Sequence, residues 1–509
     1  MKKTFLLVFV KLPLLLIIAL VLFLAFGLEP ALNTFKPQIE SSLSHLLKKE
    51  TEIKGKITIV YYPQLTLTIH KPVIKTSKKP LIQADQLVIS FQARPWPKDT
   101  LVISDIRLIR PKLAIRLGLE ESYLVPKKED KPIPFYREYL VKAGLVLFAT
   151  VNRQLPGNMT RVQSLIIQEF KIDSGDFYLG EHKGKGILNI NSIQLVLEGL
   201  YIKQFKNVTG GWRVLLNKHS LSGRLSAKVL HWQKLSLKNV KLKAKNEEGR
   251  VTFSDVKAQA RFGKAAANLT VDFRNPRIGY DLEMDLNDVD LNRVLKTYDA
   301  KVKASGVLDA NFKLASQGTT LKTLVKRLYG KLGLRGEHLT LYEMDLDAMI
   351  KNYRKSQSLG VFDIGAYMIL GPLGLLASKS IDVTSIAAHS GKKKKTRIPH
   401  VRFDWRIKRG IAQSWDVAFA TRKYRVAAGG KLDLNSQKYR NIQIALLDSK
   451  GCIEFSQMLN GPLLEPELNS MSFVGKVLAS PLTTIAKGVT SVFGSKCDIF
   501  YAGAVPHPK

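Results

Sequence analysis

The residue types that usually carry out catalysis or bind metals do not form a recognisable motif in this chain. The sequence has no G-x-S-x-G nucleophile elbow, no H-E-x-x-H zinc motif, no P-loop and no strand-linked G-x-G-x-x-G motif. The nine histidines are scattered, and His182, in GEHKGKG, has too many glycine and lysine neighbours to indicate a ligand. We therefore predict a protein that is not an enzyme and that uses no cofactor and no metal.

One acidic cluster is an exception that has to be weighed. Asp285, Asp288 and Asp290 lie close together around LNDVDL and could bind a cation. Aspartate and asparagine at such positions also cap a turn that leads out of a strand. The spacing favours the turn, and a cation site remains the alternative.

Charge narrows the choice of partners. The chain has 509 residues, of which 79 are Lys or Arg and 42 are Asp or Glu, so its formal net charge is +37. A hydrophobic fraction of 45% and a charged fraction of 24% exclude a disordered tail and a polytopic membrane protein. The positive balance suits nucleic acid, an anionic membrane surface or an acidic polymer. A generally basic source proteome would explain the same balance without any partner.

The amino terminus predicts that most of the chain is exported. Residues 12–28 (LPLLLIIALVLFLAFGL) are 17 residues without a charge, which is about the minimum for a transmembrane helix. Lys2, Lys3 and Lys11 precede this segment, and the first acidic residue, Glu29, follows it. The positive-inside rule then places the remainder on the exported side, which argues against nucleic acid as a partner.

A cleaved signal peptide is the competing interpretation of this segment. Ala25 and Gly27 provide small residues at a cleavage-like spacing. The apolar stretch is longer than the usual core of a signal peptide, so we expect an uncleaved anchor.

A short amphipathic helix follows the anchor within residues 29–50. Its apolar residues recur at spacings of three and four, and Pro37 fits only its first turn. This apolar stripe can rest on the membrane, close the end of a sheet or pack against the next strands. The stripe consists of Leu32, Phe35, Ile39, Leu43, Leu46 and Leu47.

From residue 51 to about 320 the apolar residues alternate with polar ones, as in strands with one buried and one solvated face. Helices are scarce, and the segment from Thr320 to Tyr329 is one of the few clear ones. Too few helices are present to cover the apolar face of so many strands. The alternating apolar positions that we expect to line one face are Leu65, Leu67, Ile69, Leu87, Ile89, Phe91, Leu113, Ile115, Leu269, Val271 and Phe273.

Two arrangements remove these faces from water. The sheets can pack face to face as sandwiches. Alternatively, one twisted sheet curls into an open groove whose apolar lining is covered by lipid acyl chains. Two acyl chains with roughly thirty methylenes would cost about 24 kcal/mol to expose to water, and an apolar groove removes most of that cost.

A basic loop and a cysteine pair complete the candidate sites. Lys392, Lys393, Lys394 and Lys395 form a cluster that could dock on an anionic surface, although a solvated loop explains it as well. Cys452 and Cys497 lie beside strand-like runs (CIEF and CDIF) in the exported region and bracket an amphipathic stretch. We expect them to form a disulfide, and two free thiols are the alternative.

Several stretches of the carboxyl-terminal third occur in an order that resembles one known family. Residues 308–350 contain a strand, a short helix, a glycine-bounded strand and a DLD segment; residues 362–382, 403–434, 445–468 and 496–508 follow. Together they resemble the carboxyl-terminal module of the AsmA family of bacterial envelope proteins. The resemblance covers residues 300–509 well and residues 54–69 more loosely, whereas residues 130–300 share only the strand rhythm.

The resemblance implies an inner-membrane protein with one amino-terminal span and a large periplasmic part. AsmA-like proteins are similar in architecture to repeating β-groove lipid-transfer proteins and are implicated in phospholipid traffic toward the outer membrane. No catalytic residues of the family can be carried over to this chain.

The expected molecule is therefore mostly β, with a single transmembrane helix, an elongated curved antiparallel sheet that forms a groove, and an α+β carboxyl-terminal module. Its expected function is lipid binding or transfer in the periplasm, with phospholipids and components of the two membranes as partners. The alternative is a scaffold that assists assembly of outer-membrane proteins or lipopolysaccharide. The expected segments are an anchor at 1–28, an amphipathic helix at 29–50, the β-groove at 51–307, the AsmA-like module at 308–440 and a disulfide-closed segment at 441–509.

Overall fold

The computed structural model shows a chain built mainly from β-strands. It describes residues 28–47, 49–76, 79–92, 100–117, 164–181, 186–203, 216–217, 220–300, 302–356, 395–463, 467–472 and 497–509. The predicted anchor, apart from Leu28, lies outside these residues, as do His182 and Lys392 to Lys394. Within the described ranges, no helix is both long and apolar enough to cross a bilayer.

The chain divides into two compact units, which are described separately. Unit 1 comprises residues 1–127 and 133–254, and unit 2 comprises residues 128–132 and 255–509. The division falls inside strand β13 (Arg250–Ala260). The boundary expected after residue 307 lies within strand β16, which pairs with a strand on each side.

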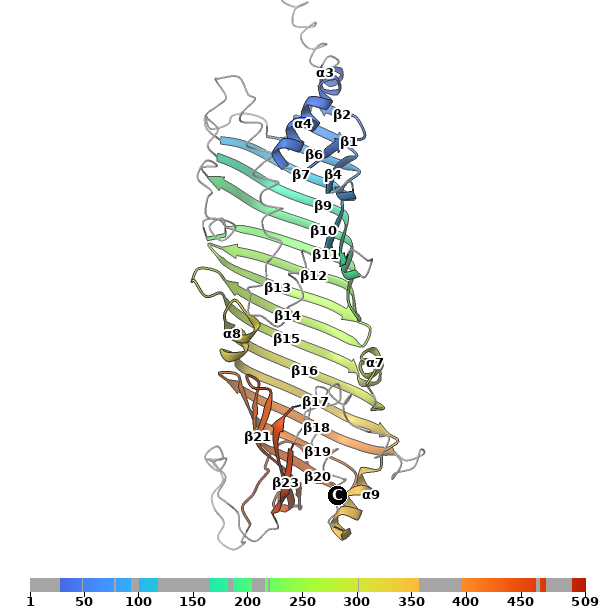
Figure 1. The fold of residues 1–509 in the computed structure, drawn as a ribbon, viewed down its shortest axis with the longest axis vertical. Coiled ribbons are helices and arrows are strands. Elements are labelled where there is room, and N and C mark those ends of the chain that lie inside the picture. Colours follow the sequence, from blue (N-terminus) through green and yellow to red (C-terminus); the bar gives the residue numbers. More distant parts are fainter. Residues whose placement is uncertain are drawn as a thin grey trace, which may run out of the picture. The chain divides into compact units, whose positions relative to one another are not determined.

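Unit 1 is a branched sheet (Figure 1). One branch joins β2, β3, β6 and β7, and the other joins β1, β4, β5 and β8. The long strand β9 receives both branches, because its first half pairs in parallel with β7 and its second half pairs in parallel with β8. Antiparallel pairing then continues through β10, β11 and β12. The strands are β1 (Thr51–Ile53), β2 (Ile57–Val60), β3 (Thr66–His70), β4 (Pro72–Thr76), β5 (Lys79–Gln83), β6 (Gln86–Phe91), β7 (Thr100–Ile109), β8 (Lys112–Leu117), β9 (Ser164–Glu181), β10 (Gly186–Lys203), β11 (Leu221–Trp232) and β12 (Leu235–Glu247).

The amphipathic segment forms two helices, α3 (Leu28–Thr34) and α4 (Lys36–Leu47), that pack against the first strands. Leu32 and Ile39 contact the buried cluster formed by Ile53, Ile57 and Ile69. The side chain of Asn33 accepts a hydrogen bond from the Ile57 backbone N–H (2.9 Å) and donates one to the Ile57 carbonyl (2.8 Å). Of the three arrangements considered for this segment, packing against the strands is therefore the one present.

Unit 2 is an antiparallel meander in which each strand from β14 to β23 pairs with the next. The predicted helix after Thr320 is confirmed as α8, whose first turn is closed by a reciprocal capping box between Thr320 and Thr323. The elements are β14 (Gly263–Asp272), β15 (Gly279–Asp290), α7 (Leu291–Thr297), β16 (Ala304–Gln317), α8 (Leu321–Lys326), β17 (Tyr329–Tyr342), α9 (Leu346–Ser356), β18 (Lys395–Lys408), β19 (Ile411–Ala420), β20 (Arg425–Asp433), β21 (Lys438–Leu447), β22 (Ile453–Pro462) and β23 (Glu467–Ser472).

The acidic cluster of LNDVDL performs structural roles. Asp290 is the N-cap of α7 and accepts a hydrogen bond from the Arg293 backbone N–H at 3.1 Å. Asp288 has a positive φ of 55° at a bulge in β15. These positions agree with the turn interpretation, and within the described ranges no three acidic, histidine or cysteine residues are grouped as a cation site requires.

Similar bulges recur in both units, and acidic or amide side chains on other strands hold them. At three of them, the residue with a positive φ is not glycine, and its backbone N–H donates to an aspartate or asparagine side chain. A bulge inserts one residue and increases the local twist of the strand, so these contacts curve the sheet. The donor and acceptor pairs are Ser192 to Asp176 (3.0 Å), Asp288 to Asp309 (3.0 Å) and Asn441 to Asn460 (2.7 Å).

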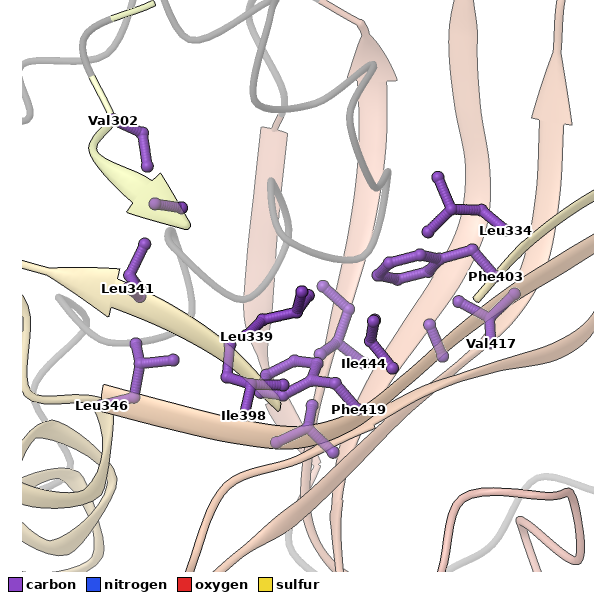
Figure 2. Packing of buried hydrophobic residues seen from close by; sticks show 14 of the residues in the cluster. Val302, Leu334, Leu339, Leu341, Leu346, Ile398, Phe403, Val417, Phe419 and Ile444 are labelled. Carbon is purple, nitrogen blue, oxygen red and sulfur yellow. The ribbon is translucent and has the colours of Figure 1, made fainter. Parts of the chain in front are cut away.

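The main core of unit 2 lies between strands β17 and β22. Side chains from the two halves of this strand series point into one cluster, in which Leu334 and Phe403 lie near Val417, and Ile398 lies near Phe419 and Ile444 (Figure 2). The sheet therefore curls at this end, so that side chains of strands β17 to β22 bury one another. In the described part of either unit, no second sheet is stacked across the whole apolar face, so the structure has an open sheet rather than a sandwich.

The opposite face of β19 to β21 is lined by small side chains and is covered by the last residues of the chain. Ala418, Ala427 and Ala445 are fully buried there, against Tyr501 and Val505. Alanine leaves room for a covering segment to approach the sheet. The carboxyl terminus is thereby part of the core of unit 2.

A disulfide holds the start of this terminal segment. Cys452 and Cys497 are joined, with their Cα atoms 6.0 Å apart, which is within the range of protein disulfides. Cys452 also forms a β-bridge with Ile499. We expect peptide mapping without reductant to recover the two cysteines in one cross-linked fragment. Recovery of both as free thiols from oxidised protein would contradict this pairing.

Tyr501 anchors the same segment through a buried polar network. Its hydroxyl donates to Asp416 Oδ1 (2.5 Å) and accepts from the Val505 backbone N–H (3.0 Å). The buried Arg425 donates to the carbonyls of Val505 (3.3 Å) and Asp448 (3.0 Å). Burial, and then the hydrogen bond to Asp416, raise the pKa of Tyr501 above its ordinary value of 10.0.

We expect Tyr501→Phe to lower the free energy of unfolding by about 1–2 kcal/mol at neutral pH, because it removes the buried hydroxyl that donates to Asp416 Oδ1. Since the folded state raises the pKa of Tyr501, the stability provided by its un-ionised ring is fully present below pH 10.0 and declines as the pH rises further. The difference in free energy of unfolding between wild type and variant, measured in urea from about pH 7 to about pH 11, should therefore stay constant up to about pH 10 and narrow above it. A difference that stayed constant over this interval would contradict the assignment.

Candidate functional site

The main candidate site is the apolar face of the sheet in unit 1. One residue from each of eight paired strands places an aliphatic side chain in a single line across this face. Each member is the direct cross-strand neighbour of the next, so their side chains lie on the same side of the sheet. This apolar row consists of Ile57, Ile69, Leu87, Leu108, Ile172, Leu195, Leu225 and Leu242, from β2, β3, β6, β7, β9, β10, β11 and β12.

Neighbouring lines repeat the pattern. Ile59, Leu67, Ile89, Ile106, Phe170 and Leu197 form a second line beside the apolar row. In the other branch, Leu113 pairs with Phe177, and Ile115 pairs with Leu179. The apolar surface is therefore several residues wide as well as eight strands long.

Burial along the apolar row changes from one end to the other. Ile57 and Ile69 are buried by the helices α3 and α4. Ile172, Leu195, Leu225 and Leu242 are only half-buried. These three leucines and Ile172 therefore lie on a part of the apolar face that the described residues do not seal.

The opposite face of the same strands is charged. In each strand, the residue next to the member of the apolar row points to this opposite face. There Arg107 is the cross-strand neighbour of Lys171, and Arg224 is that of Lys243. Arg224 forms an ion pair with Glu198 at 3.1 Å, and both side chains are largely exposed. Unit 1 is thus two-sided: one face suits water, and the other suits hydrocarbon.

Unit 2 has the same two-sided design. A line of paired residues crosses it from Ala265 through Leu286, Ala310 and Leu334 to Phe403 and Val417. The polar face carries ion pairs such as Lys313 with Glu283 (3.0 Å) and Lys264 with Asp288 (3.0 Å). The hydrogen bond to Glu283 raises the pKa of Lys313 above its ordinary value.

Most of the predicted lining residues lie in these lines. Leu67 neighbours Ile89, Ile69 neighbours Leu87, and Phe91 neighbours Ile103 in a small buried cluster. Leu113 and Ile115 lie in the other branch, and in unit 2 Leu269 pairs with Leu282 and Val271 with Tyr280.

Two predicted lining residues are placed differently. Leu65 precedes β3 and is 42% exposed, and its carbonyl accepts a hydrogen bond from the Phe91 backbone N–H. Phe273 directly follows β14, whose last paired residue is Asp272. Alternation alone could not identify them as residues at the ends of strands, because a strand end keeps the pattern of the strand.

The sequence analysis did not select the central part of the apolar row. Ile172, Leu195, Leu225 and Leu242 come from strands whose alternation is visible, but their alignment depends on which strands pair. The bulges at Ser174 and Ser192 also shift the alternation by one residue within β9 and β10. Only the tertiary structure shows that these residues form one continuous line.

Of the basic cluster, only Lys395 lies within the described residues. It is exposed and begins β18, where it is the cross-strand neighbour of Tyr342. Docking of this cluster on an anionic surface therefore stays a prediction.

Comparison with known proteins adds one finding. The model of the AsmA family matches residues 203–417, from the end of β10 to within β19. The match reaches further toward the amino terminus than the resemblance in the carboxyl-terminal third suggested, and it ends before the last four strands. No curated protein and no solved structure matches the chain.

Proposed function

Because residues 203–417 belong to the AsmA family, we propose that the protein binds and transfers phospholipid in the bacterial envelope. In this proposal residues 12–28 anchor it in the inner membrane, and the sheets extend into the periplasm. The acyl chains lie on the apolar face, and the headgroups remain near solvent. The observation that carries the proposal is the half-buried apolar row of unit 1.

The dimensions of the apolar row suit an acyl chain. Eight strands at a spacing of about 4.8 Å give a line of about 34 Å, whereas an acyl chain in one leaflet extends about 15 Å. A lipid can therefore occupy several overlapping positions along the row. A lipid that shifts by one strand at a time meets no large energy barrier to movement along the row, because each step exchanges one apolar neighbour for another.

Transfer along such a surface needs no catalytic residue. Each buried methylene is worth about 0.8 kcal/mol, so two acyl chains with roughly thirty methylenes would cost about 24 kcal/mol to expose to water. The apolar face lowers this cost collectively, and the headgroup pays no desolvation penalty if it stays in solvent. The protein acts as a carrier or conduit in this proposal, without covalent chemistry.

The proposal is tested by identifying what copurifies with the full chain. We expect organic extraction of the purified protein to release phospholipid in an amount comparable to the amount of protein. Recovery of protein that holds no phospholipid, with an outer-membrane assembly protein bound instead, would contradict lipid carriage and support the scaffold alternative.

A further inference from the structure

A pocket in unit 2 combines a basic rim with an apolar floor. It has a volume of about 510 Å³ and lies between helix α7 and the ends of strands β16 to β18. A pocket of this size accommodates a small polar group together with the first part of a hydrocarbon chain. Its lining residues are Asn292, Leu295, Lys296, Ala300, Val302, Lys303, Ala304, Tyr342, Glu343 and Lys395.

Strand pairing gathers the rim. Tyr342 is the cross-strand neighbour of Lys395, and its backbone N–H donates to the carbonyl of Lys303 at 2.8 Å. Lys303, Tyr342 and Lys395 therefore occupy adjacent positions across three strands. Lys296 is added from the last turn of α7. Three amino groups and one phenol consequently surround one opening.

The rim keeps an excess of positive charge. Among the described residues that line the pocket, Glu343 is the only acidic one, and it lies 2.6 Å from Lys303 Nζ. The hydroxyl of Tyr342 is held 2.9 Å from Ser305 Oγ. With three lysines against one glutamate, the rim carries two net positive charges that can receive an anion. Lysine ammonium groups and a hydroxyl are suitable donors for phosphate oxygens.

The floor of the pocket is continuous with the apolar core. Leu295, Val302 and Ala304 are buried members of the same cluster as Leu334 and Phe403, which lie on the apolar face. Figure 2 shows Val302 and Leu341 at one side of this cluster. A molecule whose phosphate is at the rim can therefore direct its apolar part toward the hydrocarbon face.

We infer that this pocket binds the headgroup of an anionic phospholipid and so gives the protein a preference for anionic over zwitterionic lipids. The inference rests on the proposed lipid function and adds the class of lipid to it. The exposed lysines of the polar face, in contrast, have no apolar floor beside them, because the apolar side chains of those strands point to the other side of the sheet.

The test is a competition between two lipids with identical acyl chains. The full chain in neutral detergent is loaded from an equimolar mixture of phosphatidylglycerol and phosphatidylcholine, and the bound lipids are extracted and quantified. We expect wild type to retain about fivefold or more phosphatidylglycerol over phosphatidylcholine, and Lys296→Gln/Lys303→Gln/Lys395→Gln to retain the two about equally.

Two further variants separate the pocket from general charge. Lys331→Gln/Lys408→Gln/Lys431→Gln removes three exposed lysines from the polar face of the same unit and should keep the wild-type ratio. Lys296→Arg/Lys303→Arg/Lys395→Arg should keep it as well. Equal effects of the two glutamine triples, or an unchanged ratio in the pocket triple, would overturn the pocket assignment while lipid carriage stands. Absence of both lipids from wild type would instead contradict the proposed function.

Discussion

Replacing Leu195 with aspartate should reduce the phospholipid bound by the full chain about tenfold to a hundredfold. Leu195 lies in the apolar row between Ile172 and Leu225 and is half-buried. The substitution removes an apolar contact worth about 1.5–3 kcal/mol and places a carboxylate against the acyl chain. The measurement is the amount of labelled phospholipid that crosslinks to or copurifies with the purified variant.

The adjacent residue supplies a matched control. Val196 lies on the opposite face, where its cross-strand neighbours are Lys171 and Arg224. Val196→Asp introduces the same carboxylate into the same strand, but beside two positive charges. We expect Val196→Asp to bind as much lipid as wild type. Equal losses of bound phospholipid in both variants would show that the effect comes from perturbing β10. Normal lipid binding by Leu195→Asp would contradict a role of the apolar row in lipid binding.

This substitution tests the apolar face better than one nearer the amino terminus. Leu67 also lies on that face, but it packs against the cluster that α3 and α4 cover. Leu67→Asp therefore disturbs the helix contact together with the lipid surface. Leu195 is far from this cluster in the pairing order, so its substitution reports on the part of the face that the described residues leave half-buried.

Replacing Leu446 with alanine should lower the free energy of unfolding of unit 2 by about 4 kcal/mol. Leu446 is 1% exposed in the cluster formed by β17 to β22. Removing its terminal methyl groups leaves a cavity that the surrounding strands cannot fill, and such substitutions cost about 2–5 kcal/mol. Denaturant unfolding monitored by tryptophan fluorescence measures the change, because Trp405 belongs to the same cluster.

The same substitution at an exposed position is the control. Leu321, in α8 of the same unit, is 72% exposed, so Leu321→Ala should change the free energy of unfolding by no more than about 0.5 kcal/mol. If Leu446→Ala lowered the free energy of unfolding as little as Leu321→Ala, the curled end of the sheet would not be a packed core.

Several features followed from the local sequence. Alternation predicted the strands, because a half-buried strand needs an apolar residue at every second position. Spacings of three and four predicted α4, and the helical pattern from Thr320 to Tyr329 predicted α8. The segments 308–350 and 403–434 predicted the AsmA family, whose model matches residues 203–417.

The candidate site was only partly predictable. Its residue type was clear at Leu67, Ile89 and Leu113, because each alternates with polar neighbours. Its extent was not clear, since the apolar row depends on the parallel pairing of β9 with β7. The pocket that contains Lys303 and Lys395 was also hidden, because these residues are far apart in the chain and meet only because β17 pairs with β16 on one side and with β18 on the other.

The sequence by itself determined which residues are apolar and the period at which they recur. It therefore determined that the chain forms strands with one apolar face. The tertiary structure decided which strands are neighbours, where bulges shift the alternation, and which part of the apolar face is left uncovered. The physical reason is that alternation is enforced locally by the pleat of one strand, whereas register and coverage depend on hydrogen bonds and contacts between residues distant in sequence.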